Sequence, residues 1–228
     1  MPAVPVTAVL VHSPFLGPAS LRPLADALAA LGHPAVLPDL RPSVVAPPVH
    51  QRLIGAFADV MSDAPPPGPI ALVGHSGAGP LLPAFAEQID DAGGQVRGLV
   101  YLDAGLPTPG RSWRETVPAE LYAQLRAKSP DGLLPRWPNW FPGHPVDAEI
   151  AEEAPEVPIA FLKEPRPSLD WDGPSGYVLL SGAYEADLAE AGSRGWPTRA
   201  LPLTHLAPAT DPEPVARAVL EVLLATAG

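Results

Sequence analysis

Residues 70–79 read Ile-Ala-Leu-Val-Gly-His-Ser-Gly-Ala-Gly, and this stretch decides the expected fold. Four apolar residues run into a serine flanked by small residues, and an apolar, helix-compatible segment (80–89) follows. This order is typical of a nucleophile elbow, in which a strand ends, the backbone turns sharply and a helix begins. The hydroxyl of Ser76 should then stand clear of the sheet. The N–H of Gly77 should be free at a helix N-terminus, where it stabilises developing negative charge.

The segments around the elbow must support this interpretation, because Gly/Ser/Ala clusters also form ordinary tight turns. Short apolar runs alternate with helical patterns along most of the chain, as in a parallel α/β sheet. Right-handed connections between such strands predict an α/β fold, with a doubly wound, mostly parallel sheet of about six strands. The expected strands are 6–11, 35–37, 70–73, 96–102, 177–180 and 198–201, and the expected helices are 20–31, 51–62, 79–90, 186–193 and 214–226.

One long segment, residues 106–172, interrupts the alternation. It is rich in proline, holds four of the five tryptophans and has only short helical patterns, at 118–128 and 146–153. A segment of this length between two strands is usually a functional insertion. We expect a lid over the carboxyl edge of the sheet, with residues 1–105 and 173–228 forming the core. Its aromatic side chains could instead form a small core within the lid itself.

Composition narrows the class of protein. The 228 residues suit one domain, and no apolar run reaches the ~20 residues of a membrane span. No basic region precedes an apolar stretch at the N-terminus, so a secretory signal is not expected. The chain has no cysteine and a net charge of −11, which favour a cytoplasmic protein that binds neither nucleic acid nor membranes. The expected partner is a small-molecule substrate, and the oligomeric state stays open.

A serine hydroxyl needs a base within hydrogen-bond reach to act as a nucleophile at neutral pH. Among the six histidines, His205 is the strongest candidate, because it lies in a loop between the last expected strand and the last helix. That loop should open at the same edge of the sheet as the elbow. An isolated histidine in this place would be an ordinary surface residue, and only the pairing with Ser76 indicates catalysis.

An acid should orient the base, and two positions compete for this role. Glu185 follows the fifth expected strand, and Asp103 follows the fourth. Both should lie at the carboxyl edge of the sheet, and either could instead cap a helix. Asp187 is a weaker third candidate.

The order Ser76, acid, His205 on a parallel α/β scaffold resembles the α/β-hydrolase family. The resemblance covers nearly the whole chain and implies a catalytic triad. The family places its acid after the strand that follows the lid, which favours Glu185. Some members use the end of the preceding strand, which corresponds to Asp103. The resemblance also implies that the family's usual first two strands are missing.

The loop after the first strand departs from the family pattern. Members usually carry His-Gly here, and the next residue donates its N–H to the oxyanion hole. This chain has His12, Ser13 and Pro14 at these positions, and proline has no N–H. The second donor, beside Gly77, would be the Phe15 amide or the Ser13 hydroxyl, or there would be no second donor. A missing donor slows acyl chemistry roughly 10²- to 10³-fold, and plant hydroxynitrile lyases of the same family carry threonine where Ser13 stands.

The resemblance implies a serine-dependent hydrolase that cleaves a small apolar or aromatic ester, lactone or thioester through an acyl-enzyme. Two alternatives stay open: a lyase, isomerase or cyclase that uses the same residues for acid–base chemistry, and a non-catalytic protein that binds a small ligand. The expected substrate-binding residues are His12, His75, Trp137, Trp140 and Phe141.

No other site type is indicated. The sequence has no glycine-rich phosphate-binding motif, and its histidines lack metal-ligand spacing, so neither a cofactor nor a metal is expected. Arg41 and His50 flank a proline-rich loop and are expected to be solvated surface residues.

Overall fold

Six short strands form one sheet in the order β2–β1–β3–β4–β5–β6, and all five pairings are parallel. The computed structural model describes residues 6–141 and 145–226. The predicted doubly wound sheet is confirmed, and every strand end lies within two residues of the expected one. The strands are β1 (Thr7–Val11), β2 (Ala35–Val36), β3 (Ile70–His75), β4 (Val96–Leu102), β5 (Ser175–Leu179) and β6 (Thr198–Ala200).

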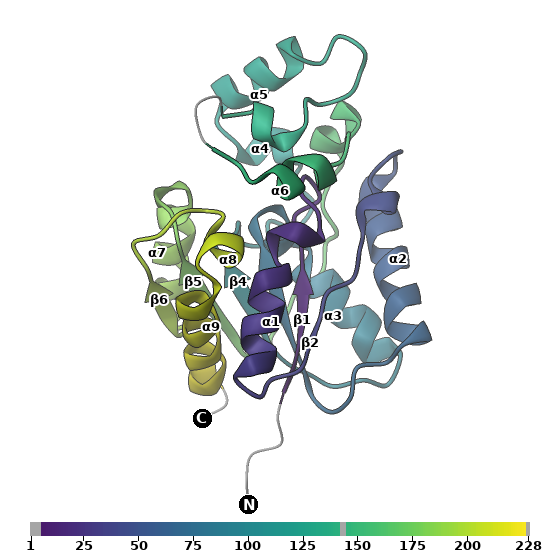
Figure 1. Cartoon of the computed structure of the whole chain (residues 1–228). Coiled ribbons are helices and arrows are strands. Elements are labelled where there is room, and N and C mark those ends of the chain that lie inside the picture. Colours follow the sequence, from purple (N-terminus) through teal and green to yellow (C-terminus); the bar gives the residue numbers. More distant parts are fainter. Residues whose placement is uncertain (1–5, 142–144, 227–228) are drawn as a thin grey trace, which may run out of the picture.

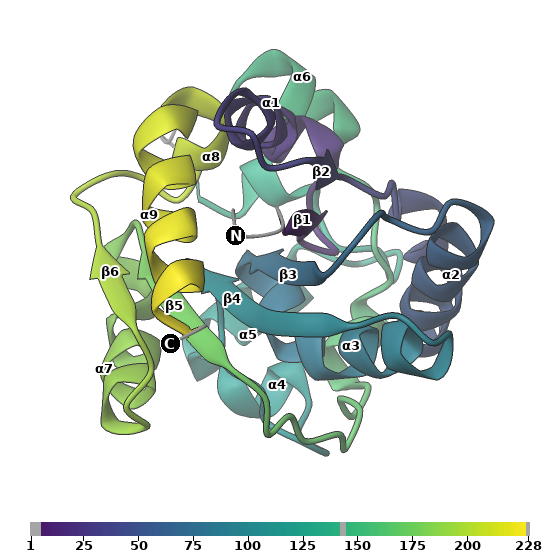
Figure 2. The same cartoon turned by 90° about the horizontal axis from the view of Figure 1, so that it is seen from below.

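Helices cover both faces of the sheet (Figures 1 and 2). Helices α1 (Arg22–Ala30), α8 (Ala207–Thr210) and α9 (Pro212–Thr226) lie on one face, and α2 (Val49–Asp63), α3 (Leu82–Asp91) and α7 (Glu185–Ser193) lie on the other. Successive residues of β1 alternate between the two cores: Val9 and Val11 face α2 and α3, and Ala8 and Leu10 face α1 and α9. Burial on both faces explains why the strands read as continuous apolar runs.

The helix expected from residue 79 begins later. A 3₁₀ segment, η3 (Ser76–Leu81), follows β3 directly, and α3 starts at Leu82. A continuous α-helix from Gly79 would need a backbone N–H at Pro83, which proline lacks. The short helix α8 ahead of α9 was not predicted.

The β4–β5 insertion (residues 106–172) lies over the carboxyl ends of the strands (Figure 1). It contains α4 (Trp113–Thr116), α5 (Ala119–Ala127) and α6 (Ala148–Glu153), together with the 3₁₀ segments η4 (Trp137–Asn139) and η5 (Ile159–Lys163). The two expected helical patterns correspond to α5 and α6. No helix among residues 6–141 and 145–226 is long and apolar enough to cross a bilayer.

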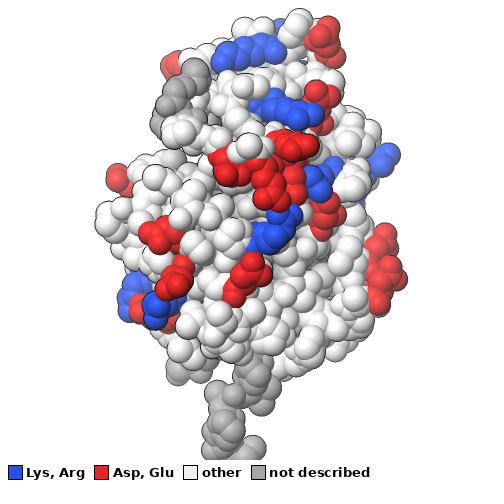
Figure 3. Space-filling model, viewed as in Figure 1, with Lys and Arg blue, Asp and Glu red and all other residues white. Residues whose placement is uncertain are grey.

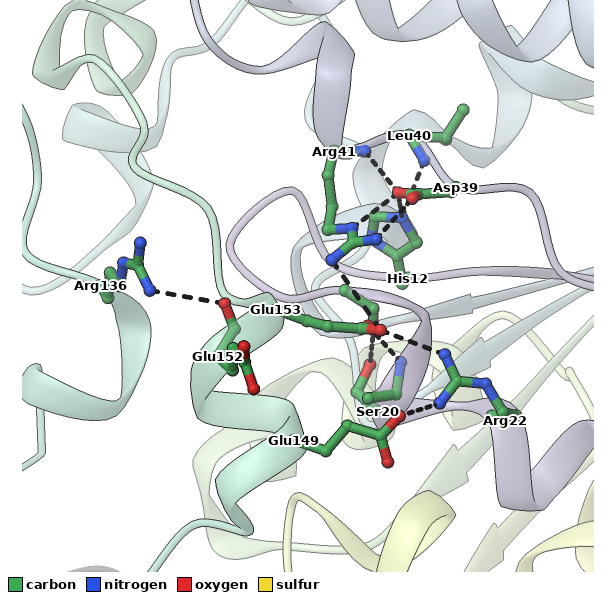
Figure 4. Close-up of polar contacts among 12 residues, drawn as sticks. His12, Ser20, Arg22, Asp39, Leu40, Arg41, Arg136, Glu149, Glu152 and Glu153 are labelled. Carbon is green, nitrogen blue, oxygen red and sulfur yellow. Dashed lines mark hydrogen bonds and ion pairs between the residues drawn. The ribbon is translucent and has the colours of Figure 1, made fainter.

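Glu153 of α6 ties the insertion to the body of the protein. Its carboxylate accepts the Ala19 N–H at 2.7 Å and the Arg22 guanidinium at 3.1 Å, and Arg41 Nη1 lies 3.8 Å away. A Cβ at Gly17 would lie 2.6 Å from the Glu153 carboxylate, so only glycine permits this approach. Arg41 is therefore part of an ion-pair network (Figure 4), whose charged groups gather where α6 meets the start of α1 (Figure 3). Its other pairs are Arg22–Glu149 and Arg41–Asp39.

Candidate active site

Ser76 occupies a sharp turn between β3 and η3. Its φ is +57°, in the left-handed region that side chains rarely adopt. The turn brings neighbouring segments very close. A Cβ at Gly74 would lie 2.8 Å from the Leu82 side chain, and one at Gly79 would lie 2.4 Å from the Gly105 carbonyl oxygen. Glycine at these two positions is what lets the strand, the turn and the helix pack so tightly that Ser76 is held in a strained conformation.

The space beside Gly77 is framed by the loop after β1 and by the insertion. A Cβ on Gly77 would lie 3.1 Å from Ser13 Oγ, 3.2 Å from the Trp113 ring and 3.3 Å from Pro14 Cδ. Gly77 is the second residue of η3, where the backbone N–H has no partner within the helix. The Phe15 N–H donates to Ser13 Oγ at 3.3 Å. Of the three atoms nearest to a Cβ on Gly77, Ser13 Oγ is the polar one, and it also holds the Phe15 N–H.

His205 is hydrogen-bonded to Asp103. The distance from His205 Nδ1 to Asp103 Oδ2 is 2.7 Å, and the carboxylate is fully buried. Asp103 also accepts hydrogen bonds from the Leu180 N–H, the Ser181 N–H and the Ser181 hydroxyl, at 2.9, 2.9 and 2.6 Å. Burial opposes ionisation, but the His205 contact and these hydrogen bonds outweigh it and hold the pKa of Asp103 below its usual value. His205 therefore carries its proton on Nδ1 and leaves Nε2 as the basic nitrogen.

The expectation that Glu185 partners His205 is wrong. Glu185 is the exposed first residue of α7, whereas Asp103 follows β4, next to β3 in the sheet. The Asp103 backbone has φ +43°, a tight turn that brings its side chain to His205. Asp187 accepts the N–H of Leu106 at 2.9 Å and so fixes the start of the insertion.

Three aromatic rings surround the His205 imidazole. His75 stacks on it at a centroid distance of 4.6 Å, and Trp137 and Tyr184 lie at 5.7 and 5.8 Å. His75 Nε2 donates to the His205 carbonyl oxygen at 2.9 Å, so His75 holds both the ring and the backbone of its neighbour. Burial, followed by the nearby His205, keeps the pKa of His75 well below its usual value. His75 is thus a neutral support beneath the site.

Tyr184, which was not among the predicted site residues, reaches the candidate nucleophile. Its hydroxyl lies 3.5 Å from Ser76 Oγ. Among the hydrogen bonds of the described residues, Ser76 Oγ has this one partner, and none joins it to His205. In unliganded sites such bonds often form only when substrate binds. The one available signal was position, since Tyr184 follows β5 immediately before the residue expected to be the acid.

Two expected histidine positions are corrected. His12 does not line a pocket, because its Nδ1 donates to the Ser13 carbonyl oxygen at 2.9 Å and its Nε2 accepts the Leu40 N–H at 3.0 Å. His50 is buried rather than solvated. Its ring packs against Phe161 at 4.9 Å, and its backbone N–H donates to Glu164, which caps the start of α2.

The three expected aromatic residues fall in different environments. Trp140 is buried and packs on Phe15 at 4.8 Å, so it belongs to the core. Trp137 stands beside His205, and Phe141 packs on Trp137 at 5.8 Å while 41% of its surface stays exposed. Of these three, Trp137 contacts the candidate site, and Phe141 lies at its outer side.

Comparisons with known proteins agree with this architecture. No protein-family model and no curated protein matches the sequence. Many solved structures match this fold, among them three that superimpose over nearly the whole chain. An extracellular α/β-hydrolase from a Paenibacillus species has a TM-score of 0.75 and 21% identity, covering 96% of this chain and 99% of its own. A pyrethroid hydrolase from Sphingobium faniae has a TM-score of 0.68 and 19% identity, with coverages of 97% and 98%. Polyneuridine aldehyde esterase has a TM-score of 0.70 and 18% identity, with coverages of 96% and 99%. The chain has the α/β-hydrolase fold.

Proposed function

We propose that the protein is a serine hydrolase that cleaves a small carboxylic ester, lactone or thioester. Ser76 is the nucleophile, His205 the general base, and Asp103 the acid that orients the base. The observation that carries this proposal is the 2.7 Å contact between Asp103 and His205 beside a serine held in a strained turn.

The reaction follows from the positions of these groups. Ser76 Oγ attacks the substrate carbonyl carbon while its proton passes to His205 Nε2. The Gly77 N–H and the Ser13 hydroxyl stabilise the negative charge that forms on the carbonyl oxygen. The bond to the leaving group breaks, and His205 returns the proton to that group. A water molecule, with His205 again as the base, then attacks the acyl-enzyme carbonyl. This step releases the carboxylic acid and restores Ser76.

The surroundings favour an uncharged, apolar or aromatic substrate. The rings of Trp113 and Trp137 border the site on the insertion side, which suits apolar acyl or alcohol groups. Two structural neighbours are a pyrethroid hydrolase and polyneuridine aldehyde esterase, which supports ester chemistry. In this proposal residues 106–172 act as a lid that excludes water.

A second candidate uses the same residues without an acyl-enzyme, as a lyase, isomerase or cyclase. One feature favours it: Pro14 has no N–H, and the Phe15 N–H is directed to Ser13 Oγ. The oxyanion site then depends on one amide and one hydroxyl. A protein that only binds a ligand would not need Ser76, His205 and Asp103 together.

Covalent labelling tests the proposal. A fluorophosphonate should add one label per chain, on Ser76. Labelling should be abolished in Ser76→Ala and strongly slowed in His205→Ala. The unmodified protein should also turn over p-nitrophenyl butyrate. Labelling without ester turnover would favour the lyase or cyclase candidate. Absence of labelling, with tight binding of a small apolar ligand, would favour a binding protein.

A further inference from the structure

Tyr184 is the polar side chain closest to the Ser76 hydroxyl that the proposed chemistry leaves unused. It lies in η6 (Gly182–Tyr184), just after β5, with its hydroxyl 3.5 Å from Ser76 Oγ. Its ring is nearly parallel to that of His205, at an interplanar angle of 25° and a centroid distance of 5.8 Å. The phenol is thereby held against both reacting groups.

The phenol keeps its proton at neutral pH. Burial raises the pKa of Tyr184 to about 12, and the nearby carboxylates of Asp103 and Asp187 act in the same direction, against the opposing hydrogen bond with Ser76. A protonated phenol can donate a hydrogen bond. Its hydrogen-bond partner among the described residues is the Ser76 hydroxyl.

Sheet order decides which oxygen of the substrate Tyr184 faces. Ser76 follows β3, Ser13 follows β1 on one side of that strand, and Tyr184 follows β5 on the other side. The carbonyl oxygen belongs on the side of Ser13 and Gly77. The leaving group belongs on the side of His205, which must protonate it. Tyr184 is therefore on the leaving-group side.

We propose that Tyr184 is a further catalytic residue, whose hydroxyl donates a hydrogen bond to Ser76 Oγ at rest and to the leaving-group oxygen during bond cleavage. This inference rests on the proposed hydrolase function. His205 still carries out the proton transfers: it takes the Ser76 proton and gives it to the departing oxygen. Tyr184 keeps its own proton and shares the negative charge that builds up on that oxygen as the carbon–oxygen bond breaks.

The need for such a donor depends on the leaving group. An alkoxide is a strong base and departs only when its charge is stabilised, whereas p-nitrophenolate departs readily by itself. Loss of the Tyr184 hydroxyl should therefore impair alkyl esters far more than activated aryl esters. A residue with a merely structural role would affect both substrates alike.

The test compares Tyr184→Phe with the unmodified enzyme on ethyl butyrate and p-nitrophenyl butyrate, which share an acyl group. Phenylalanine retains the ring beside His205 and removes only the hydroxyl. We expect kcat for ethyl butyrate to fall roughly tenfold or more, because the transition state loses one hydrogen bond to a developing charge. For p-nitrophenyl butyrate, kcat should change less than about threefold. Tyr122→Phe, in α5, is the matched control and should change neither rate.

Labelling by a fluorophosphonate tests whether the variant site is intact, because fluoride leaves without a proton donor. The labelling rate should be nearly unchanged in Tyr184→Phe. Equal losses on both esters, or no loss on either, would overturn the Tyr184 proposal while leaving the hydrolase proposal in place. If the unmodified protein cleaves neither ester and takes up no label, the hydrolase function fails and the Tyr184 proposal fails with it.

Discussion

Asp103 Oδ2 and His205 Nδ1 lie 2.7 Å apart, although 102 positions separate the two residues in the chain. The contact depends on the Asp103 backbone, which turns at φ +43° directly after β4. Hydrogen bonds from Leu180 and Ser181, at the end of the neighbouring strand β5, hold the carboxylate in place. The acid is therefore positioned by two adjacent strands before it meets the base.

Asp103→Asn should lower kcat about 10³- to 10⁴-fold with little change in fold. If the amide oxygen keeps the bonds to the Leu180 and Ser181 N–H groups, the amide nitrogen faces His205 Nδ1. His205 Nδ1 must then accept a hydrogen bond from the amide N–H. The imidazole proton therefore sits on Nε2, which can no longer act as a base. Glu185→Gln is the control and should stay within twofold of the unmodified protein. Ester turnover by both variants measures the difference, and a larger loss in Glu185→Gln would reassign the acid.

Ser13→Ala should lower kcat roughly 10²- to 10³-fold with little effect on KM, because the hydroxyl beside Gly77 acts mainly on the charge that forms during the reaction. Ser43→Ala removes another buried serine hydroxyl, in η2 (Arg41–Ser43), and should leave kcat unchanged. Steady-state kinetics on p-nitrophenyl butyrate separates the two. An unchanged kcat in Ser13→Ala would indicate that the Phe15 amide, released from Ser13, supplies the donor instead.

Gly79→Ala should destabilise the protein by about 2–3 kcal/mol, because the new Cβ would lie 2.4 Å from the Gly105 carbonyl oxygen and 2.8 Å from Ala104 Cβ. Gly55→Ala, in α2, meets nothing within 4 Å and should stabilise by about 0.5–1 kcal/mol through helix propensity. Urea unfolding measures both. If Gly79→Ala proved no more destabilising than Gly55→Ala, the segments of Gly79 and Gly105 could move apart without loss of stability.

The sheet and the elbow could be predicted from the sequence, because their signals are local. Apolar runs buried on both faces identify strands, and small residues around Ser76 identify the turn. The partner of His205 could not be chosen this way. Asp103 and Glu185 both follow strands that end at the same edge, and only the turn at Asp103 and the exposure of Glu185 separate them.

The environments of side chains in loops could not be predicted from the sequence either. His12 and His50 read as polar residues near loops, yet the His12 ring accepts from Leu40 and the His50 ring packs on Phe161, and both partners are distant in the chain. Tyr184 gave no signal of its own, since a tyrosine after a strand is common. Its relation to Ser76 arises from the order of strands across the sheet.

Acid should destabilise the fold partly through His50. Burial lowers its pKa from 6.5 to about 4, so between these values the unfolded chain binds more protons than the folded one. Stability is then lost as the pH falls below about 6.5. His50→Phe removes this proton uptake and keeps a ring against Phe161. The loss of unfolding free energy between pH 7 and pH 5 should be about 2 kcal/mol smaller in the variant. Identical losses in both proteins, measured by urea unfolding, would contradict the prediction.

Glu153→Gln should weaken the attachment of α6 to the body of the protein. The carboxylate is mostly buried and accepts from the Ala19 N–H and from Arg22, with Arg41 close by. Glutamine places an amide N–H₂ where an anion faces these donors, so unfolding should become easier by about 1–3 kcal/mol. Amide exchange in residues 148–153 should rise first, because α6 loses its anchor before the sheet unfolds.

Glu221→Gln is the matched control for Glu153→Gln. Glu221 pairs with Arg199 at 2.8 Å, but both side chains are more than half exposed. Water and salt screen such a pair, so its loss should change the unfolding free energy by less than about 0.5 kcal/mol. The contrast isolates the effect of burial and of the Ala19 N–H. If both variants lose the same small amount, the contacts of Glu153 do not hold the insertion, and its position over the sheet depends on apolar packing around Trp140 and Phe15 instead.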